Sequence, residues 1–208
     1  MGKTLAEALV DFDQDFVLAE INKRLDEGEE PIQIVRELQR GMGLIGERFN
    51  SGEFFLSELL MSADLFTKAM DILEPQLAGT VQETIGKIVI GTPKGDIHDI
   101  GKNIFCVVAK GAGFEVHDLG VDVPVNRFVE VVEEIRPQIL GFSALLTTAF
   151  EPMKQVVDQL AEKGLRESLK VIVGGGVTTE TVKKYLGADG QAIDAIDGLN
   201  QCKKLLQL

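Results

Sequence analysis

The feature that most constrains the fold is a change in hydrophobic periodicity near residue 86. Before it, apolar residues recur at helical spacing and no strand-like run occurs, which predicts helices over residues 4–10, 13–27, 31–49 and 55–73. From residue 86 onward, short β-branched runs alternate with amphipathic stretches, as in successive βα units on a parallel sheet. The chain is therefore predicted to contain two domains of different class.

The C-terminal part reads as five strands, each followed by a helix. The strands are expected at residues 87–91, 115–119, 139–143, 171–174 and 188–192, and the helices at 101–111, 126–135, 150–163, 179–186 and 194–206. This alternation is typical of a doubly wound, flavodoxin-like or Rossmann-like parallel sheet, which binds ligands beyond the carboxyl ends of its strands at the switch point. The loops after the first, third and fourth strands are therefore the expected site.

The N-terminal part is predicted to be a four-helix bundle, which makes the fold class α plus α/β. We expect the bundle over residues 1–78, a linker or hinge at 79–86, where periodicity is lost and breakers occur, and the sheet domain over 87–208. One broad apolar stripe on the last helix of the bundle is expected to form a wall: Leu56, Leu59, Leu60, Ala63, Phe66, Met70 and Leu73.

Composition excludes several classes of function. A formal net charge of −12 argues against sequence-independent nucleic-acid binding, which needs a basic face. No apolar run approaches the roughly 18 to 20 residues that cross a bilayer, and no basic segment leads into an apolar one at the start, so we expect a cytoplasmic protein without a membrane partner. The two cysteines, Cys106 and Cys202, have no metal-ligand spacing and are expected to be inert.

The common nucleotide-binding motifs are missing from the loops. No G-x-x-x-x-G-K-[ST] follows the first strand, and no G-x-G-x-x-G opens the first helix of the sheet domain. A phospho-receiver would carry an aspartate at the end of the third strand, where this chain has Ser143.

The loops do offer one histidine among polar and glycine neighbours. Two interpretations are open: His98 and Asp96 form general-base machinery for a Ser143 nucleophile, or His98 ligates a metal while Asp96 orients it. Ser143 lacks the glycine-flanked turn of a nucleophile elbow. A protein-only metal site needs three or four ligands, and none is spaced to join His98. A metal that brings its own equatorial ligands needs only one.

Three sequence elements resemble the signature of cobalamin-binding domains. They are DIHDIG at residues 96–101, SAL starting at Ser143, and the glycine run 174–176, which match D-x-H-x-x-G, S-x-L and G-G in order. The stretch GEFFLSELLMSADLFTKAM, residues 52–70, is similar to the helical cap that precedes the cobalamin domain in methionine synthase and in small corrinoid proteins. The resemblance covers essentially the whole chain.

The resemblance implies that the chain binds cobalamin, as methylcobalamin, hydroxocobalamin or a related corrinoid, with His98 replacing the cofactor's own base as the lower axial ligand of cobalt. Asp96 and Ser143 would form a relay behind His98. The other cofactor-binding residues implied are Gly95, Ile97, Asp99, Ile100, Gly101, Leu145, Thr147, Gly174, Gly175 and Gly176. The methyl face would be shielded by Phe55, Leu56 and Leu59.

The function implied by the resemblance is methyl carriage through cobalt(I) and methyl-cobalt(III), with no enzymatic activity of the chain on its own. Its partners would be a substrate-specific methyltransferase, an acceptor methyltransferase acting on tetrahydrofolate or a thiol, and a reductive activase. The alternatives are a cobalamin-dependent sensor or regulator, the B12-binding subunit of a mutase, and a serine hydrolase acting through Ser143.

Overall fold

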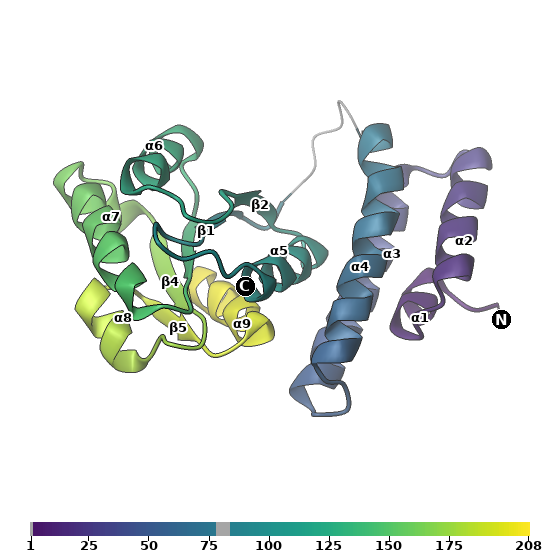
Figure 1. Ribbon diagram of the computed structural model, residues 1–208. Coiled ribbons are helices and arrows are strands. Elements are labelled where there is room, and N and C mark those ends of the chain that lie inside the picture. Colours follow the sequence, from purple (N-terminus) through teal and green to yellow (C-terminus); the bar gives the residue numbers. More distant parts are fainter. Residues whose placement is uncertain (1, 78–83) are drawn as a thin grey trace. The chain divides into compact units, whose positions relative to one another are not determined.

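The chain forms two compact units, one helical and one built around a sheet, in a computed structural model that describes residues 2–77 and 84–208 (Figure 1). The predicted linker at 79–86 falls mostly on residues 78–83, which lie outside the described residues. The linker and the exact domain boundaries therefore stay predictions.

Within the described residues, the N-terminal unit consists of four α-helices and one 3-10 turn. The helices are α1 (Leu5–Val10), α2 (Gln14–Asp26), α3 (Pro31–Asn50) and α4 (Leu56–Leu73), and the turn is Glu74–Leu77. The side chains of Thr4 and Asp13 cap α1 and α2, and Pro31 begins α3, where its missing N–H costs nothing. Each helix begins and ends within one residue of its predicted range.

The buried face of α4 differs in part from the predicted stripe. Leu59, Ala63, Phe66 and Leu73 are buried as expected, but Leu56 and Leu60 are exposed. The face is completed instead by Ser62, Leu65 and Ala69. Because a helix turns by about 100° per residue, this shift of the buried face rotates positions 56 and 60 toward solvent.

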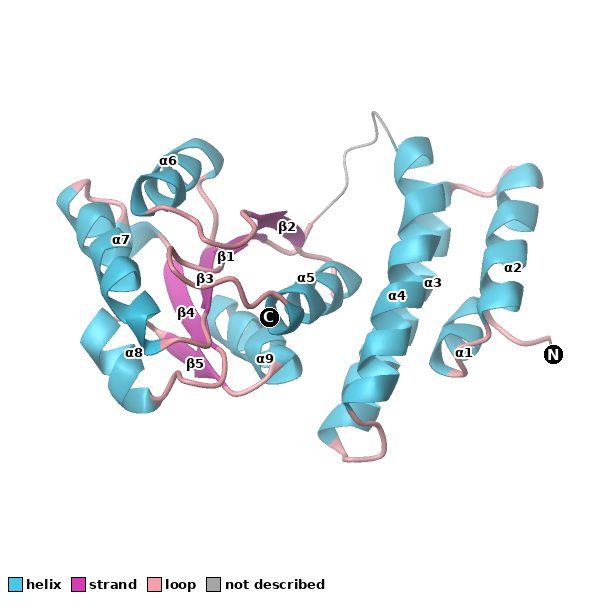
Figure 2. Ribbon diagram, in the orientation of Figure 1, coloured by secondary structure: helices cyan, strands magenta, loops and turns pink. Residues whose placement is uncertain are grey.

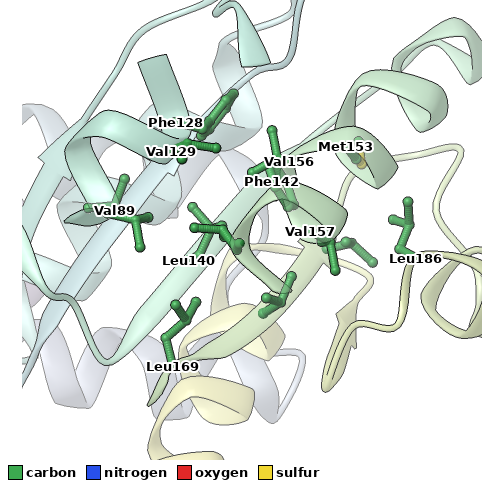
Figure 3. Packing of buried hydrophobic residues seen from close by; sticks show 14 of the residues in the cluster. Val89, Phe128, Val129, Leu140, Phe142, Met153, Val156, Val157, Leu169 and Leu186 are labelled. Atoms are coloured by element: carbon green, nitrogen blue, oxygen red, sulfur yellow. The ribbon is translucent and has the colours of Figure 1, made fainter. Parts of the chain in front are cut away.

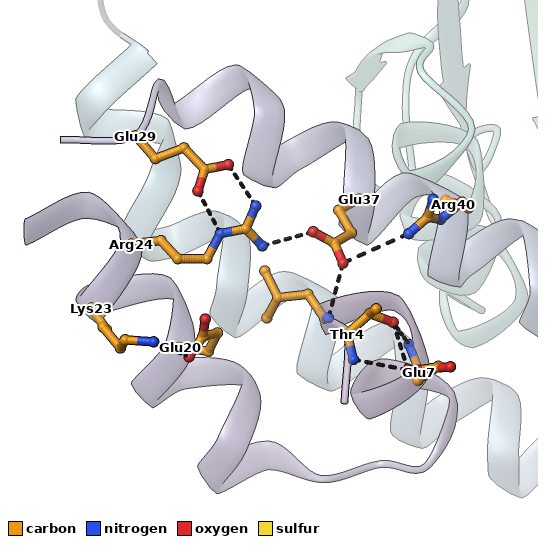
Figure 4. A network of polar contacts seen from close by, with 9 residues as sticks. Thr4, Glu7, Glu20, Lys23, Arg24, Glu29, Glu37 and Arg40 are labelled. Atoms are coloured by element: carbon orange, nitrogen blue, oxygen red, sulfur yellow. Dashed lines mark hydrogen bonds and ion pairs between the residues drawn. The ribbon is translucent and has the colours of Figure 1, made fainter. Parts of the chain in front are cut away.

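A polar network joins the first three helices of this unit (Figure 4). The Arg24 guanidinium donates to both oxygens of Glu29, at 2.7 and 2.5 Å, and to Glu37 Oε2 at 2.7 Å. The other oxygen of Glu37 accepts the N–H of Leu5 at 3.0 Å. Glu37 therefore satisfies one of the backbone donors that the start of α1 leaves without a helical partner.

The C-terminal unit is a five-stranded parallel sheet with helices on both faces (Figure 2). The strands are β1 (Lys87–Gly91), β2 (Glu115–Asp118), β3 (Ile139–Ser143), β4 (Lys170–Gly174) and β5 (Gly190–Ala192), and the helices are α5 (Ile100–Gly111), α6 (Val125–Ile135), α7 (Phe150–Glu162), α8 (Glu180–Leu186) and α9 (Ala195–Leu206). The strand order β2-β1-β3-β4-β5 confirms the predicted doubly wound class and places the switch point between β1 and β3.

The main core of this unit lies between the sheet and α6, α7 and α8 (Figure 3). Val89, Leu140 and Phe142 pack there, and the Phe142 ring meets Phe128 edge-on with ring centroids 5.1 Å apart. The central strands are buried on both faces, which explains their continuous β-branched runs. This core holds the strand ends that carry the loops.

Cys202 lies in α9 with no exposed surface, and burial raises the pKa of its thiol to about 12. Because the thiolate is the reactive form, we expect Cys202 in a Cys106→Ala variant to resist Ellman's reagent at pH 8 until the chain is unfolded. Complete modification of the native variant within seconds would contradict this burial.

None of the helices in residues 2–77 and 84–208 combines the length and the hydropathy needed to span a bilayer.

Candidate functional site

The candidate site is formed by the loops that leave β1 and β3 on either side of the switch point. These two strands pair in parallel, with Ile90 opposite Gly141 and Gly91 opposite Phe142, so their following loops start side by side. The loop after β1 carries His98, and the loop after β3 carries Leu145. The topology therefore brings the two predicted motifs together.

The β1 loop is a turn held by backbone contacts. The N–H of Asp96 donates to Pro93 O at 3.1 Å, and Gly95 takes a φ of +88°, a conformation that glycine adopts without strain. The N–H of Gly95 donates to Asp122 Oδ1 at 2.8 Å. Thr92 is fully buried, and its hydroxyl donates to the backbone O of His98 at 3.3 Å. These contacts fix the backbone on both sides of Asp96.

The Asp96 carboxylate orients the His98 ring. Asp96 Oδ1 lies 2.7 Å from His98 Nδ1 and also accepts the N–H of His98 at 3.0 Å. The Asp96 side chain is fully buried, whereas 48% of the His98 side chain is exposed. A carboxylate only accepts hydrogen bonds, so Nδ1 carries a proton, and in the neutral ring Nε2 then keeps its lone pair. Among the described residues, Nε2 has no hydrogen-bond partner.

The protonation state of Asp96 follows from its hydrogen bonds. Burial by itself raises the pKa of this carboxyl, but hydrogen bonds from the N–H groups of His98, Leu145 and Leu146 and from the imidazole outweigh it, so the pKa lies below its ordinary value. Asp96 Oδ2 accepts the N–H of Leu145 at 2.7 Å and that of Leu146 at 2.9 Å. Asp96 is therefore an ionised link between the two loops.

The predicted relay through Ser143 is not what the structure contains. In the described part of the chain, the Ser143 hydroxyl makes no hydrogen bond to Asp96 or to His98. The reason is that two backbone N–H groups of the same loop already occupy Asp96 Oδ2. The nucleophile interpretation loses its support for the same reason, because it requires a hydrogen bond from Ser143 to His98.

The glycine run after β4 lies beside the loop after β3. Ser143 pairs with Gly174 in the parallel register, and the N–H of Ala144 donates to Gly174 O at 2.9 Å. Gly175 has a φ of +108°, and a Cβ there would lie 2.0 Å from Ala144 O. Glycine at 175 is thus required by the contact between two loops of the chain, and not only by a ligand slot as the resemblance suggested.

We expect Gly175→Ala to lower the free energy of unfolding by about 2 to 4 kcal/mol, because it combines a disfavoured φ with a backbone clash. Chemical denaturation measures this loss. Gly101→Ala is the matched comparison, because a Cβ at 101 meets no atom within 4 Å and the φ there is not positive. Equal stability of Gly175→Ala and the natural chain would contradict the described loop contact.

Exposed apolar side chains form a rim at the edge of the sheet where the strands end and where the His98 loop also lies. Of the large apolar residues exposed in the described chain, six follow the carboxyl ends of strands: Ile97, Ile100, Val121, Leu145, Leu146 and Ile193. Ile97 and Ile100, on either side of His98 and Asp99, are 71% and 67% exposed. Thr147, which begins a 3-10 turn, is also exposed. An apolar rim around a half-exposed imidazole is suited to a large ligand with an apolar face.

The predicted methyl-face residues lie in the helical unit. Phe55 and Leu56 are 67% and 54% exposed at the start of α4, and the N–H of Phe55 donates to Glu58 Oε2 at 2.8 Å. Leu59 is buried in the core of its own unit and offers no surface to a ligand in this structure. Only the first two of the three predicted residues are available for contact.

Sequence reasoning missed several supporting residues of the site. Thr92, Asp122 and the N–H of Leu146 hold the His98 loop, and Lys102 is a buried lysine next to it. The sequence did contain one indication of Lys102. It is an isolated lysine in the first turn of an otherwise apolar helix face, where a positive charge opposes the helix dipole.

The side chains available as metal ligands fit a metal that takes only one ligand from the protein. Among the described residues, no group of three or more His, Cys, Asp or Glu side chains is placed to hold a metal ion. One imidazole with a free Nε2, a carboxylate behind Nδ1 and an apolar rim match a metal whose other ligands belong to a macrocycle. The residues present therefore fit a corrinoid.

Comparisons with known proteins agree with this geometry. Two family models described as B12 binding domains match residues 2–74 and 86–200. Dimethylamine corrinoid protein 2 of Methanosarcina acetivorans is 41% identical over 204 residues, covering 97% of this chain and 94% of that protein.

Two solved structures are similar over nearly the whole chain. One is a cobalamin-binding protein from Desulfitobacterium hafniense, with a TM-score of 0.74, 39% identity, and coverage of 97% of this chain and 96% of that one. The other is the methanol:cobalamin methyltransferase complex MtaBC from Methanosarcina barkeri, with a TM-score of 0.86, 28% identity, and coverage of 98% and 78%.

Proposed function

Because the chain belongs to the family of B12-binding corrinoid proteins, we propose that it binds cobalamin and carries a methyl group between two partner enzymes. The observation that carries this proposal is the His98 imidazole at the switch point, with Nδ1 held by buried Asp96 and Nε2 unpaired among the described residues. If the cofactor's own base stayed on the cobalt, a protein imidazole held in this way would not be needed as a ligand.

His98 would hold the cobalt of the corrinoid through Nε2. Asp96 holds the proton on Nδ1, which fixes the tautomer and the direction of the ring and makes Nε2 a better electron donor. The bound corrinoid supplies the cobalt centre that accepts and releases the methyl group. Ile97, Ile100 and Leu145 supply apolar contact area for the macrocycle, and the open space beside Gly101 leaves room for it.

The remaining predicted contacts concern the cofactor's nucleotide tail and its upper face. We assign the tail to the region of Thr147 and the loop Gly174–Gly176, which lie at the carboxyl ends of β3 and β4. We assign the methyl face to Phe55 and Leu56, which are apolar and exposed. Gly95 and Asp99 would contribute to cofactor binding by shaping the His98 loop.

The chain has no enzymatic activity of its own in this proposal. A substrate-specific methyltransferase loads it, an acceptor methyltransferase for tetrahydrofolate or a thiol unloads it, and a reductive activase restores inactive cobalt. The similarity to the methanol:cobalamin methyltransferase complex MtaBC supports the first of these partners. The relatives reported above support neither the sensor nor the mutase subunit.

Cofactor binding tests the proposal. The purified chain is mixed with hydroxocobalamin under anaerobic conditions, desalted, and examined by visible spectroscopy. We expect one corrinoid to stay with each chain. Methyl loading is then followed with methyl-labelled substrate in an extract of the native host. A chain that emerges colourless from desalting would refute the carrier function.

A further inference from the structure

Lys102 is a buried cation in an unfavourable place. It is the third residue of α5, and only 2% of its surface is exposed. Positive charge near a helix N-terminus opposes the helix dipole, and a buried ammonium group loses its hydration. The other buried positions of α5, among them Ile104, Val108 and Ala109, are apolar. If the side chain at position 102 served only to fill the core, an apolar residue would stabilise the fold at least as well as lysine.

Lys102 is connected to the His98 loop through its neighbour in sequence. Lys102 Nζ donates to Asn103 Oδ1 at 2.7 Å. The amide nitrogen of Asn103 donates to Asp99 Oδ2 at 3.1 Å, and the Asn103 N–H donates to Asp99 O at 2.8 Å. Because Asp99 directly follows His98, this arm fixes the point where the loop enters α5.

A second arm runs from Lys102 through the end of β2. Lys102 Nζ lies 2.5 Å from Asp118 Oδ2, and Asp118 Oδ1 accepts the N–H of Gly120 at 2.8 Å. Gly120 in turn accepts the N–H of Thr92 at 2.9 Å. Asp118 therefore orients the segment that follows β2 against the residue that begins the His98 loop.

The segment after β2 is hydrogen-bonded along the start of the His98 loop. The N–H of Asp122 donates to Asp96 O at 3.0 Å, and Asp122 Oδ1 accepts the N–H of Gly95. The N–H of Val123 donates to Thr92 O at 3.0 Å. Each of these hydrogen bonds involves a residue between Thr92 and Asp96. This part of the loop places the Asp96 carboxylate next to the imidazole.

We infer that Lys102 and Asp118 form a positioning pair that sets the His98 loop for axial ligation of cobalt, an inference that rests on the proposed function. The pair joins both ends of the loop: through Asn103 at Asp99, and through Gly120 at Thr92. Neither residue touches the cofactor in this role. The pair acts by keeping the imidazole and the Asp96 carboxylate in their hydrogen-bonded arrangement.

The test separates positioning from stability with three variants and one control. Lys102→Met removes the buried charge and keeps an apolar chain. Asp118→Asn removes the carboxylate charge and keeps one acceptor oxygen, which can still take the N–H of Gly120, while the acceptor that faces Lys102 is lost. A double variant tests the coupling of the two residues. The control is Lys163→Met, which removes the exposed 2.9 Å ion pair with Glu133. For each chain we would measure the unfolding midpoint without cofactor, the affinity for hydroxocobalamin, and the fraction of bound, reduced corrinoid that carries a protein imidazole by electron paramagnetic resonance.

We expect Lys102→Met to keep the unfolding midpoint, because the Asp118 side chain is 35% exposed and water can solvate its carboxylate once the ammonium group is gone. The affinity is expected to fall by about tenfold to a hundredfold, together with the imidazole-bound fraction. Asp118→Asn is expected to show a smaller loss of the same kind, and the double variant to be no worse than Lys102→Met. The control is expected to match the natural chain.

The inference is overturned if Lys102→Met and Asp118→Asn both bind with natural affinity and a full imidazole signal. In that result His98 still ligates, so the proposed function stands. A natural chain without any protein imidazole signal would instead refute the proposed function together with the inference. Should Lys102→Met fail to fold, Asp118→Asn decides the question alone, since the Asp118 side chain is 35% exposed and the amide keeps an acceptor for the N–H of Gly120.

Discussion

Replacing His98 by alanine is expected to remove the protein ligand from cobalt and to weaken corrinoid binding on the order of a hundredfold. Among the described residues no group of three or more potential ligands could hold the metal in place of the imidazole. The apolar rim stays intact in the variant. Some corrinoid is therefore expected to bind with an altered visible spectrum, in which the axial position holds water or the cofactor's own base. Titration followed by absorbance gives both the affinity and the spectrum.

His117 provides the matched control for this experiment. It is the other histidine of the chain, its Nε2 lies 2.6 Å from Glu115 Oε1, and it sits on the edge strand β2. His117→Ala is expected to leave affinity and spectrum unchanged. If His117→Ala alters the spectrum and His98→Ala does not, the assignment of the ligand is wrong.

Replacing Asp96 is expected to have the second largest effect, because one buried carboxylate serves two loops. Asp96→Ala removes the acceptor for three backbone N–H groups, two of which belong to the loop after β3. We expect a loss of about 3 kcal/mol in the free energy of unfolding. The affinity for corrinoid is expected to fall by about tenfold to a hundredfold. Denaturation and cofactor titration measure the two losses.

Asp96→Asn separates the two roles of the carboxylate. An amide has one acceptor and one donor side, and the N–H groups of Leu145 and Leu146 orient its oxygen toward them. Its NH₂ group then faces His98 Nδ1, which must accept, so the ring proton moves to Nε2 and blocks ligation. The backbone N–H of His98 loses its acceptor on the same side. We expect this variant to lose less stability than Asp96→Ala and to lose the protein imidazole signal. Asp158→Ala, which removes an exposed carboxylate on α7 paired with Lys154, is the control for a general charge effect. Full ligation in Asp96→Asn would contradict the assigned tautomer.

The fold could be predicted from the sequence because periodicity reports which face of each element is buried. Buried β-branched runs placed β1 and β4, and the starts of α1 and α2 coincided with the capping residues Thr4 and Asp13. The stripe on α4 was only partly predicted, because the buried face is centred on the side of the helix that carries Ser62, Leu65 and Ala69, away from positions 56 and 60. Packing within the unit decided for Leu59 and against Leu56 and Leu60.

The site could be predicted only as a set of motifs. The placement of Asp96 beside His98 follows from their spacing in the loop. The partners of Asp96 Oδ2 depend on how β3 is aligned with β1, which sequence spacing does not encode. That alignment brings backbone N–H groups to Asp96 and leaves the Ser143 hydroxyl out. The position of Gly175 likewise depends on how closely two loops approach, with Ala144 O in the space of its missing Cβ.

The most direct test of the account is the electron paramagnetic resonance spectrum of the chain loaded with cobalamin, reduced to cobalt(II), and prepared once with ordinary and once with ¹⁵N-labelled histidine. Ligation by His98 predicts that each cobalt line splits into three in the ordinary sample and into two in the labelled sample. A His98→Ala sample would show neither protein pattern. A threefold splitting that persists after labelling would show that the cofactor's own base remains bound, and it would contradict the central claim.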